Sequence, residues 1–421
     1  MNVLLVKIHE PLVIDEGQPR LLRMSLIAEK LIEAGHKVTY WSSDLDYRSR
    51  ENRFGVDKEC HISKNYSIWI RTAPLFKKHV SFNRLIHNYV LSKKLERDLV
   101  LVKDIDLILC SFPTIELAAI CAAFGVNSNV PVVIDIRDLW PDIFEIRLSK
   151  LKRLFGWFLI KYWRNVVRKS FLEATCLTAI SPGILRWAQN QINVQREFDK
   201  YFYHGYPSSN SLNQVNEILV CKKLESMGVH VNFKKFTICY LGQLTQTVDF
   251  DDVIAGMAML KRRNQNVQLI VCGTGDKEVE FRRKADGLEN IIFTGWVGSD
   301  VGAFIMKSAK ASLICYHSTP DYEMSIPNKI PEYLSYGLPI LCSIDGYPRE
   351  IIEKNNCGIY YKSGSVNSFV ESVNALCMNP YSRSTMSQNA VKTFSDNFSS
   401  EVVYGAMVKH LEGVVRQFRG C

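Results

Sequence analysis

Long hydrophobic runs are missing from this chain of 421 residues. No stretch approaches the roughly 18 to 20 unbroken apolar residues that a membrane-spanning helix needs. The first apolar run, Val3 to Val6, is also too short for a signal peptide. The composition, 47% hydrophobic and 23% charged, is typical of a soluble globular protein. We therefore expect a cytoplasmic protein.

Metal-binding and nucleic-acid-binding motifs are missing as well. The twelve cysteines are scattered, with no CxxC pair and no Cys/His cluster. Several of them, such as Cys110, Cys239, Cys272 and Cys315, stand inside apolar, strand-like runs. This pattern favours buried, reduced thiols over a zinc site or disulfides. Because no helix-turn-helix, RNA-binding aromatic or zinc pattern is found, we expect no nucleic-acid partner.

Strand and helix patterns alternate twice along the chain. The first half has amphipathic helical stretches at Arg20–Ala34 and Thr114–Phe124 between apolar strands, a pattern typical of parallel α/β sheets. The strands predicted there are Asn2–Ile8, Lys37–Trp41, Ile105–Cys110, Val130–Asp135 and Thr175–Ile180. Those predicted in the second half are Phe236–Leu241, Val267–Cys272, Asn290–Phe293, Ala311–Tyr316, Pro339–Ser343 and Gly358–Tyr361.

The polar stretch His204–Asn216 interrupts this alternation and indicates a linker between two domains. We predict an α/β protein with two doubly wound, parallel-sheet domains whose ligand loops lie at the carboxyl ends of the strands. The predicted divisions are an N-terminal domain at 1–205, a linker at 206–235, a second domain at 236–395 and a C-terminal helix at 396–421.

The segment Asp321–Gly346 carries the most informative local pattern. After an apolar strand, Asn328 is placed to cap a short helix that starts at Lys329 and is stopped by Gly337. A helix N-terminus at the carboxyl edge of a parallel sheet attracts phosphate. Here Lys329 adds a positive charge, and Glu332 offers a carboxylate for ribose hydroxyls. The pattern suits a nucleotide-sugar diphosphate.

Five motifs in order resemble those of retaining GT-B glycosyltransferases of family 4, and among them the O-antigen and capsule enzymes. They are the segment above, EPLVIDEGQPRLLRMSLIAEKLIEAGHKVTYWSS (10–43), DIRDLWPDIF (135–144), GTGDKE (273–278) and NIIFTGWV (290–297). N-acetyl-L-fucosamine transferases are the nearest named group. The resemblance implies two Rossmann-like domains facing a central cleft, with the last helix crossing back to the first domain.

The resemblance also assigns phosphate-side residues. Gly17, with Arg20 near the start of the first helix, matches a loop that passes the donor diphosphate, although a plain turn glycine fits equally well. Gly242 matches a glycine that lets backbone approach phosphate. Relatives follow that glycine with an Arg and a Lys, whereas this chain has Gln243 and Val248. The phosphate charge is then expected to be met by Lys329, Arg20, Arg23 or helix ends, with Lys329 favoured.

Other positions match less closely. Glu332 corresponds to the second glutamate of a pair separated by seven residues, but Glu323 stands one residue too early for the first; for both, the alternative is an ordinary surface glutamate. Relatives often have His-Asp after the fourth strand, where this chain has Arg137 and Asp138. Their catalytic role competes with a structural Arg–Asp pair or a helix cap at Asp138.

Nucleotide-side positions follow from the same resemblance. Gly273 and Gly275 form a GxG without the third glycine of a dinucleotide site. Trp296 and Val297 would lie by the nucleotide base, although Trp296 equally fits a core position. Two DxD-like pairs, 44/46 and 104/106, suggest a metal enzyme of another fold, but the second pair precedes its strand instead of following it. We expect no required metal.

The function implied by the resemblance is retaining transfer of a sugar from a nucleotide diphosphate donor, expected to be UDP-linked. The acceptor would be polyprenyl-diphosphate-linked or an oligosaccharide, in bacterial surface polysaccharide assembly. The leaving phosphate would accept the acceptor's proton, so no cofactor and no protein nucleophile are expected. Two alternatives stay open: a nucleotide-sugar 2-epimerase of the same fold, which needs acid/base residues, and a non-catalytic basic binding protein.

The net charge of +9 comes mainly from the first half, because residues 1–200 carry 30 Lys and Arg against 22 Asp and Glu. Arg147–Lys169 and Arg71–Lys94 contain no acidic residue and mix cations with aromatic side chains. We predict that these segments dock the first domain peripherally on the anionic inner membrane surface. The alternative is a core helix with a solvated basic face. The cations predicted to matter most are Lys150, Lys152, Arg153 and Lys161.

Overall fold

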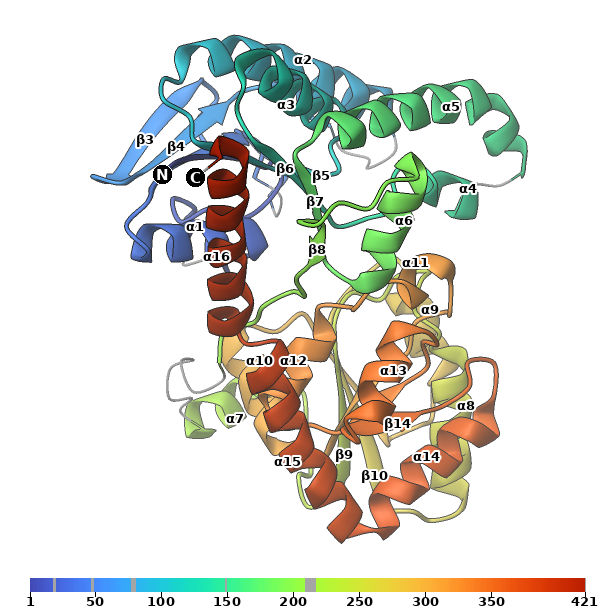
Figure 1. Cartoon of the computed structure of the whole chain (residues 1–421). Helices are drawn as coiled ribbons and strands as arrows, with labels where there is room; N and C mark the ends of the chain where they lie inside the picture. The colour runs from blue at the N-terminus through green and yellow to red at the C-terminus, as the bar shows by residue number, and fades with distance from the viewer. Residues whose placement is uncertain (18–19, 47–48, 77–80, 148–149, 209–216, 421) are drawn as a thin grey trace. The chain divides into compact units, whose positions relative to one another are not determined.

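A computed structural model describes the chain except residues 18–19, 47–48, 77–80, 148–149, 209–216 and 421; of residues 146–147 and 150–155 it describes the backbone alone. The chain divides into two compact units (Figure 1). Unit 1 comprises residues 1–203 and 403–421, and unit 2 comprises residues 204–402. In the described part of the chain, no helix has the length and hydropathy that a membrane crossing requires.

Unit 1 is built on an eight-stranded sheet in the order β3-β4-β2-β1-β5-β6-β7-β8. All neighbouring strands are parallel except the antiparallel pair β3 and β4. The strands are β1 (Asn2–Val6), β2 (Lys37–Ser43), β3 (Lys58–Ser63), β4 (Tyr66–Arg71), β5 (Leu107–Phe112), β6 (Val132–Ile136), β7 (Cys176–Ala179) and β8 (Lys200–Tyr201). The helices are α1 (Arg23–Glu33), α2 (Phe82–Leu101), α3 (Ile115–Ser128), α4 (Ile143–Arg147), α5 (Lys150–Glu173) and α6 (Pro182–Ile192).

The sequence of helix α1 explains why this helix packs on the sheet of unit 1. Its buried residues Met24, Ile27, Ala28 and Leu31 recur at the spacing of one helical face. They join a core with β1 and the last helix, α16 (Ser400–Arg419), whose residues from 403 onward belong to unit 1. The sequence predicted a start at Arg20, but the helix begins at Arg23.

Unit 2 contains a six-stranded, entirely parallel sheet in the order β11-β10-β9-β12-β13-β14. Its strands are β9 (Phe236–Leu241), β10 (Val267–Cys272), β11 (Ile291–Gly295), β12 (Ala311–Ile314), β13 (Ile340–Cys342) and β14 (Gly358–Tyr360). Its helices are α7 (Glu217–Ser226), α8 (Asp251–Arg262), α9 (Glu278–Lys284), α10 (Ser299–Ser308), α11 (Pro320–Glu323), α12 (Lys329–Ser335), α13 (Tyr347–Lys354), α14 (Val366–Met378) and α15 (Pro380–Asn397).

The structure can be compared with three expectations from the sequence. The α/β class with parallel sheets is confirmed, and the cysteines expected in strands, Cys110, Cys239, Cys272 and Cys315, are buried free thiols. The stretch expected to be a linker contains helix α7, which packs against α10 within unit 2.

Candidate functional site

Three glycines lie where the loops that follow β9 and β10 in unit 2 come into contact. The Gly242 amide donates to the Cys272 carbonyl at 2.8 Å. A Cβ atom on Gly273, whose φ is +149°, would lie 1.8 Å from the Gly242 carbonyl oxygen. A Cβ on Gly275 would lie 2.2 Å from the Leu244 carbonyl oxygen. Gly273 and Gly275 are therefore required because the two loops touch backbone to backbone.

Lys329 lies against the same loop. Its ammonium donates to the Leu241 carbonyl and lies 5.4 Å from the centroid of the Tyr240 ring. A Cβ on Gly242 would come within 2.1 Å of the Lys329 Nζ atom. Gly242 thus leaves the space that the ammonium occupies, and the structure brings together two residues that the sequence selected separately.

Helix α12 starts at Lys329, and Gly337 follows its end with φ +64°, as predicted. Asn328 occupies the N-cap position, but its own conformation is helical and its side chain accepts no hydrogen bond from the first turn. The expected side-chain cap is therefore wrong. The Ile330 amide instead donates to the Pro327 carbonyl at 2.9 Å, so the segment before the helix continues its turn.

The two candidate glutamates are held by different neighbours. Glu332 Oε1 accepts a hydrogen bond from the Tyr206 hydroxyl at 3.1 Å. Glu323 Oε1 accepts one from the Ser318 hydroxyl at 2.6 Å. Both side chains are partly exposed, so each carboxylate keeps access to a ligand. Next to Glu332, the buried Tyr333 hydroxyl accepts from the Leu241 amide at 2.9 Å and fixes α12 to β9.

The two positions where relatives carry phosphate-binding cations serve structural purposes here. The carbonyl of Gln243 accepts a hydrogen bond from the Tyr240 hydroxyl at 2.9 Å. Val248 is 3% exposed and forms a β-bridge with Tyr316. A valine suits this buried position, whereas a lysine would lose its hydration there.

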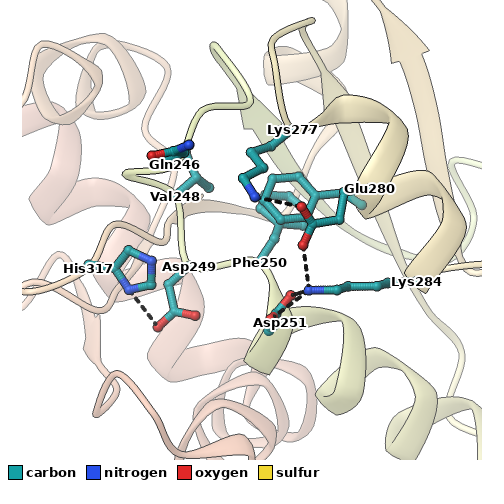
Figure 2. Close-up of a pocket in the computed structure, with 10 residues that line it drawn as sticks. Gln246, Val248, Asp249, Phe250, Asp251, Lys277, Glu280, Lys284 and His317 are labelled. Carbon is teal, nitrogen blue, oxygen red and sulfur yellow. Dashed lines mark hydrogen bonds and ion pairs between the residues drawn. The ribbon is translucent and has the colours of Figure 1, made fainter.

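A neighbouring pocket of about 300 Å³ contains two lysines that are already neutralised (Figure 2). Lys277 pairs with Glu280 at 2.6 Å, and Lys284 pairs with Glu280 at 2.9 Å and with Asp251 at 2.7 Å. Figure 2 shows these four side chains turned toward one another on the side of the pocket opposite His317. Since carboxylates compensate both lysines, this pocket offers a phosphate little net positive charge.

Trp296 and Val297 follow β11 at the same edge of the sheet. The Trp296 side chain is 74% exposed, which excludes the core position left open by the sequence. Gly295, just before it, adopts φ +73° and accepts from the Gly273 amide at 2.8 Å. An exposed aromatic ring next to a glycine turn is available for stacking on a nucleotide base.

The first loop of unit 1 holds the two other phosphate-side candidates. Gly17 is exposed, with φ +77°, and no atom lies within 4 Å of the place that a Cβ would take there. This geometry is that of a turn glycine in a left-handed conformation. Arg20 is exposed and precedes the N-cap residue Leu22. Their role toward a diphosphate remains a prediction.

Arg137 and Asp138 stand just past the carboxyl end of β6. Arg137 pairs with Asp135 at 3.1 Å and with Glu10, and its side chain is only 11% exposed. Burial opposes its charge, but the two carboxylates raise the pKa of Arg137. Asp138 accepts from the Leu139 amide at 2.8 Å. The sequence left open a structural ion pair between Arg137 and Asp138. Arg137 does form a structural ion pair, but its aspartate partner is Asp135.

Arg23 completes this network and is not available as a phosphate ligand. Its side chain is 1% exposed and makes two hydrogen bonds of 2.9 Å to the two carboxylate oxygens of Asp135. Burial alone would raise the pKa of Asp135. The positive charges of Arg23 and Arg137 outweigh this effect and hold the pKa of Asp135 below its usual range. Among the options for the phosphate charge, the structure disfavours Arg23 because Asp135 already compensates its charge.

Sequence reasoning missed the residues directly after β1. Glu10 accepts from the Met24 amide at 3.3 Å and pairs with Arg137. His9, with φ +62°, places its Nε2 atom 3.2 Å from Nε2 of His87. Burial and neighbouring positive charge lower the pKa of both imidazoles. The signal was available, since the polar residues of KIHE stand at the carboxyl end of a strand.

Among the residues with described side chains, no group of three or more His, Cys, Asp or Glu is arranged to hold a metal ion.

Comparisons of the sequence with known proteins give one family match. Residues 225–393 match the family described as glycosyl transferases group 1, a range that includes the Gly242 loop, Lys329 and Glu332. A search of curated proteins gives no significant match.

Among solved structures, HepE of Anabaena in complex with UDP is 16% identical with a TM-score of 0.67, covering 98% of this chain and 100% of HepE. Sucrose-phosphate synthase from Thermosynechococcus elongatus is 13% identical with a TM-score of 0.72, covering 100% and 99%. WaaG, a glycosyltransferase involved in lipopolysaccharide biosynthesis, is 14% identical with a TM-score of 0.66, covering 98% and 100%.

Proposed function

We propose that this chain, a glycosyltransferase with the GT-B fold, transfers a sugar with retention from a UDP-linked donor to a lipid-linked or oligosaccharide acceptor. The observation that carries the proposal is the placement of the Lys329 ammonium against the glycine loop after β9, within the range that matches group 1 glycosyl transferases. A cation at the carboxyl edge of a parallel sheet is placed to stabilise a diphosphate leaving group.

The donor class is supported by the likeness to HepE, which was solved with UDP and with UDP-glucose. In unit 2, Glu332 supplies a carboxylate for ribose hydroxyls, and the exposed Trp296 ring supplies a surface for the base. Lys329 then faces the phosphates between them. We assign Asn328, Val297 and Glu323 to the same donor-binding set, with Glu323 on the sugar side.

Retention follows from a mechanism in which the leaving phosphate oxygen takes the proton of the acceptor hydroxyl as the new glycosidic bond forms on the same face. The protein's contribution is to position the two substrates and to offset the charge that develops on the diphosphate. Lys329 offsets this charge, and the Arg137 and Asp138 segment of unit 1 is assigned to positioning. This mechanism needs neither a protein nucleophile nor a cofactor.

The acceptor side is supported by an apolar surface on unit 1. A cavity of about 260 Å³ lies between α2 and α5, lined by Phe82, Leu85, Leu159 and Trp163 among others. The same two helices carry several exposed aromatic side chains. They are Phe82 (74%), Tyr89 (61%), Trp157 (45%), Phe158 (77%) and Tyr162 (63%).

These rings support peripheral docking on an anionic cytoplasmic membrane face, where a polyprenyl-linked acceptor lies. Lys161 and Arg168, on the same helix, are exposed. The predicted contributions of Lys150, Lys152 and Arg153 concern side chains outside the described residues. A place in O-antigen, capsule or other lipopolysaccharide assembly follows from this acceptor class and from the likeness to WaaG.

The test of the proposed reaction is product analysis. Purified protein is incubated with a panel of UDP-sugars, with and without a polyprenyl-diphosphate-linked monosaccharide, and products are analysed by NMR. We expect a new glycosidic bond with the donor's anomeric configuration, and activity that persists in EDTA. An inverted product would contradict retention, and conversion of the donor alone to its 2-epimer would favour the epimerase.

Docking is tested by vesicle flotation. Wild type is expected to float with anionic vesicles at low salt, and less with added salt. The double variant Phe158→Ser, Tyr162→Ser and the variant Lys161→Gln are expected to float less. Tyr381→Ser is the control, because Tyr381 is also a highly exposed aromatic residue but belongs to unit 2. Failure of wild type to float would refute docking without affecting the transferase proposal.

A further inference from the structure

Polar residues occupy matching register positions on neighbouring strands at the carboxyl edge of the unit 1 sheet. Ser111 pairs in register with Asp135, and Asp135 pairs with Thr178. The last paired position of β1 is Val6, opposite Trp41 of β2 and Cys110 of β5. One residue further on, Lys7 therefore lies level with Ser42 and Ser111.

This row faces the core formed with α1. Strand side chains alternate, so Lys7 points to the same side as Val3 and Leu5, which pack in that core. Asp135 is on the same side, because Arg23 of α1 reaches it. Lys7 is thus a partly buried ammonium beside the Arg23–Asp135–Arg137–Glu10 network, not a surface lysine.

Several polar atoms of this region lack partners within the described part of the protein. They are Ser42 Oγ, Ser111 Oγ and Arg137 Nη2, all buried. The Lys7 ammonium likewise makes no hydrogen bond or ion pair with any residue that the structure describes. Buried polar groups are almost always satisfied in folded proteins. Four donors at one sheet edge, two of them cationic, therefore indicate a missing acceptor.

The local charges are unequal as well. Lys7, Arg23 and Arg137 contribute three positive charges, whereas Glu10 and Asp135 contribute two negative ones. Asp135 is engaged by both arginines, and Glu10 by Arg137 and the first turn of α1. Lys7 is therefore the cation whose positive charge no carboxylate of this network compensates. Burial, and then repulsion by Arg137, lower the pKa of Lys7 to about 8.

We propose that Lys7 and the free Nη2 of Arg137 form a binding site for a phosphate or diphosphate group at the carboxyl edge of unit 1. The serine hydroxyls of the row add neutral donors. A bound oxyanion satisfies these donors and supplies the negative charge that the network lacks. The group comes either from the nucleotide donor or from a diphosphate-linked acceptor. Only this choice of source rests on the proposed function; oxyanion binding itself does not.

The test is calorimetric titration of the full-length protein with two probes, UDP and geranyl diphosphate. Lys7→Met removes the charge at similar volume. Lys37→Met is the matched control, because Lys37 is exposed at the opposite end of the neighbouring strand β2. We expect Lys7→Met to weaken one probe at least tenfold, and Lys37→Met to weaken neither. Loss of UDP affinity identifies the donor as the source, and loss of geranyl diphosphate affinity identifies the acceptor.

The pH dependence gives a second readout. The titratable groups that act electrostatically on Lys7 are Arg137, Glu10, Asp135 and Cys110, and Lys7 in turn helps to lower the pKa of His9, which keeps that imidazole neutral. The raised pKa of Arg137 and the lowered pKa of Asp135 keep both charged between pH 7.5 and 9.5. The affected probe should therefore bind wild type more weakly as the pH rises through about 8. Cys110→Ala should keep this dependence.

Lys7→Arg keeps a positive charge at high pH and should abolish the dependence while retaining affinity at pH 9.5. If Lys7→Met fails to fold, the pH dependence of Lys7→Arg still tests the phosphate site. Equal affinities of wild type and Lys7→Met for both probes would overturn the proposal, as would no binding of either probe by wild type. If sugar transfer is nevertheless observed, the phosphate site alone is refuted and the proposed function stands.

Discussion

The carboxyl edge of the sheet is built differently in the two units. In unit 2, Gly273 and Gly275 let two loops meet backbone to backbone, and Gly242 leaves room for Lys329, which donates to the Leu241 carbonyl. In unit 1, the same edge is built from the charged side chains Arg23 and Asp135 and their neighbours. A backbone-built edge tolerates little added volume, whereas a charge-built edge is sensitive to the loss of one partner of a buried ion pair.

The largest expected effect comes from breaking the buried network of unit 1. Asp135→Asn leaves Arg23 and Arg137 without their shared carboxylate, and removing one partner of a buried pair costs about 3 to 5 kcal/mol. Chemical denaturation at pH 7 measures this loss. Asp251→Asn is the matched control: its side chain is 62% exposed in the network of Figure 2, and we expect no resolvable change. Equal effects of the two changes would contradict the comparison.

The same variant has a predicted pH dependence. Because the pKa of Asp135 is lowered in the folded protein, its stabilising effect is present above the unfolded value of about 4 and is lost as the pH falls below it. The stability difference between wild type and Asp135→Asn should therefore shrink in acid. A difference that stays constant down to pH 3 would show that the ionised carboxylate is not what stabilises the fold.

The next largest effect tests the backbone-built edge. Gly273→Ala forces a Cβ onto the Gly242 carbonyl oxygen and strains a φ of +149°, which together should cost about 3 kcal/mol. Gly287→Ala is the control, since Gly287 also has a positive φ but open space around it. It measures the cost of an alanine in an uncrowded left-handed conformation, roughly 1 kcal/mol. Thermal unfolding compares them, and equal midpoints would argue against close packing of the two loops.

A smaller effect is expected at the ribose position. Glu332→Gln keeps the shape of the side chain and the Tyr206 contact but loses charged hydrogen bonds, worth about 1 kcal/mol more than neutral ones. UDP affinity should fall roughly fivefold by calorimetry. Glu350→Gln, an exposed glutamate of α13, should bind UDP like wild type. Unchanged affinity in Glu332→Gln would remove the ribose assignment.

Much of the fold was predictable because most strands are apolar runs and the helices alternate with them. The exceptions have physical causes. Strand β3 is almost wholly exposed and polar, so it has no hydrophobic pattern, and β8 is only two residues long. Helix α1 starts three residues later than predicted, at an arginine that faces the core because Asp135 lies there.

The candidate site was only partly predictable. The glycines stood out through their match to the family's loops, and Lys329 through its position at a helix N-terminus near the sheet edge. That a Cβ on Gly242 would meet the Lys329 ammonium is a tertiary fact, since 87 residues separate them. The sequence places Lys7 and Glu10 at the carboxyl end of a strand, but nothing local shows that Arg137, more than 120 residues away, lies beside them.

The central claim is that the edge of unit 2 binds the donor diphosphate through Lys329. It is tested most directly by titrating UDP into Lys329→Ala and into Lys310→Ala, an exposed lysine at the opposite end of the same sheet. Lys329→Ala should bind UDP at least tenfold more weakly, a loss of about 1.4 kcal/mol or more, and turn over at least tenfold more slowly. Lys310→Ala should match wild type. Wild-type affinity and turnover in folded Lys329→Ala would contradict the account.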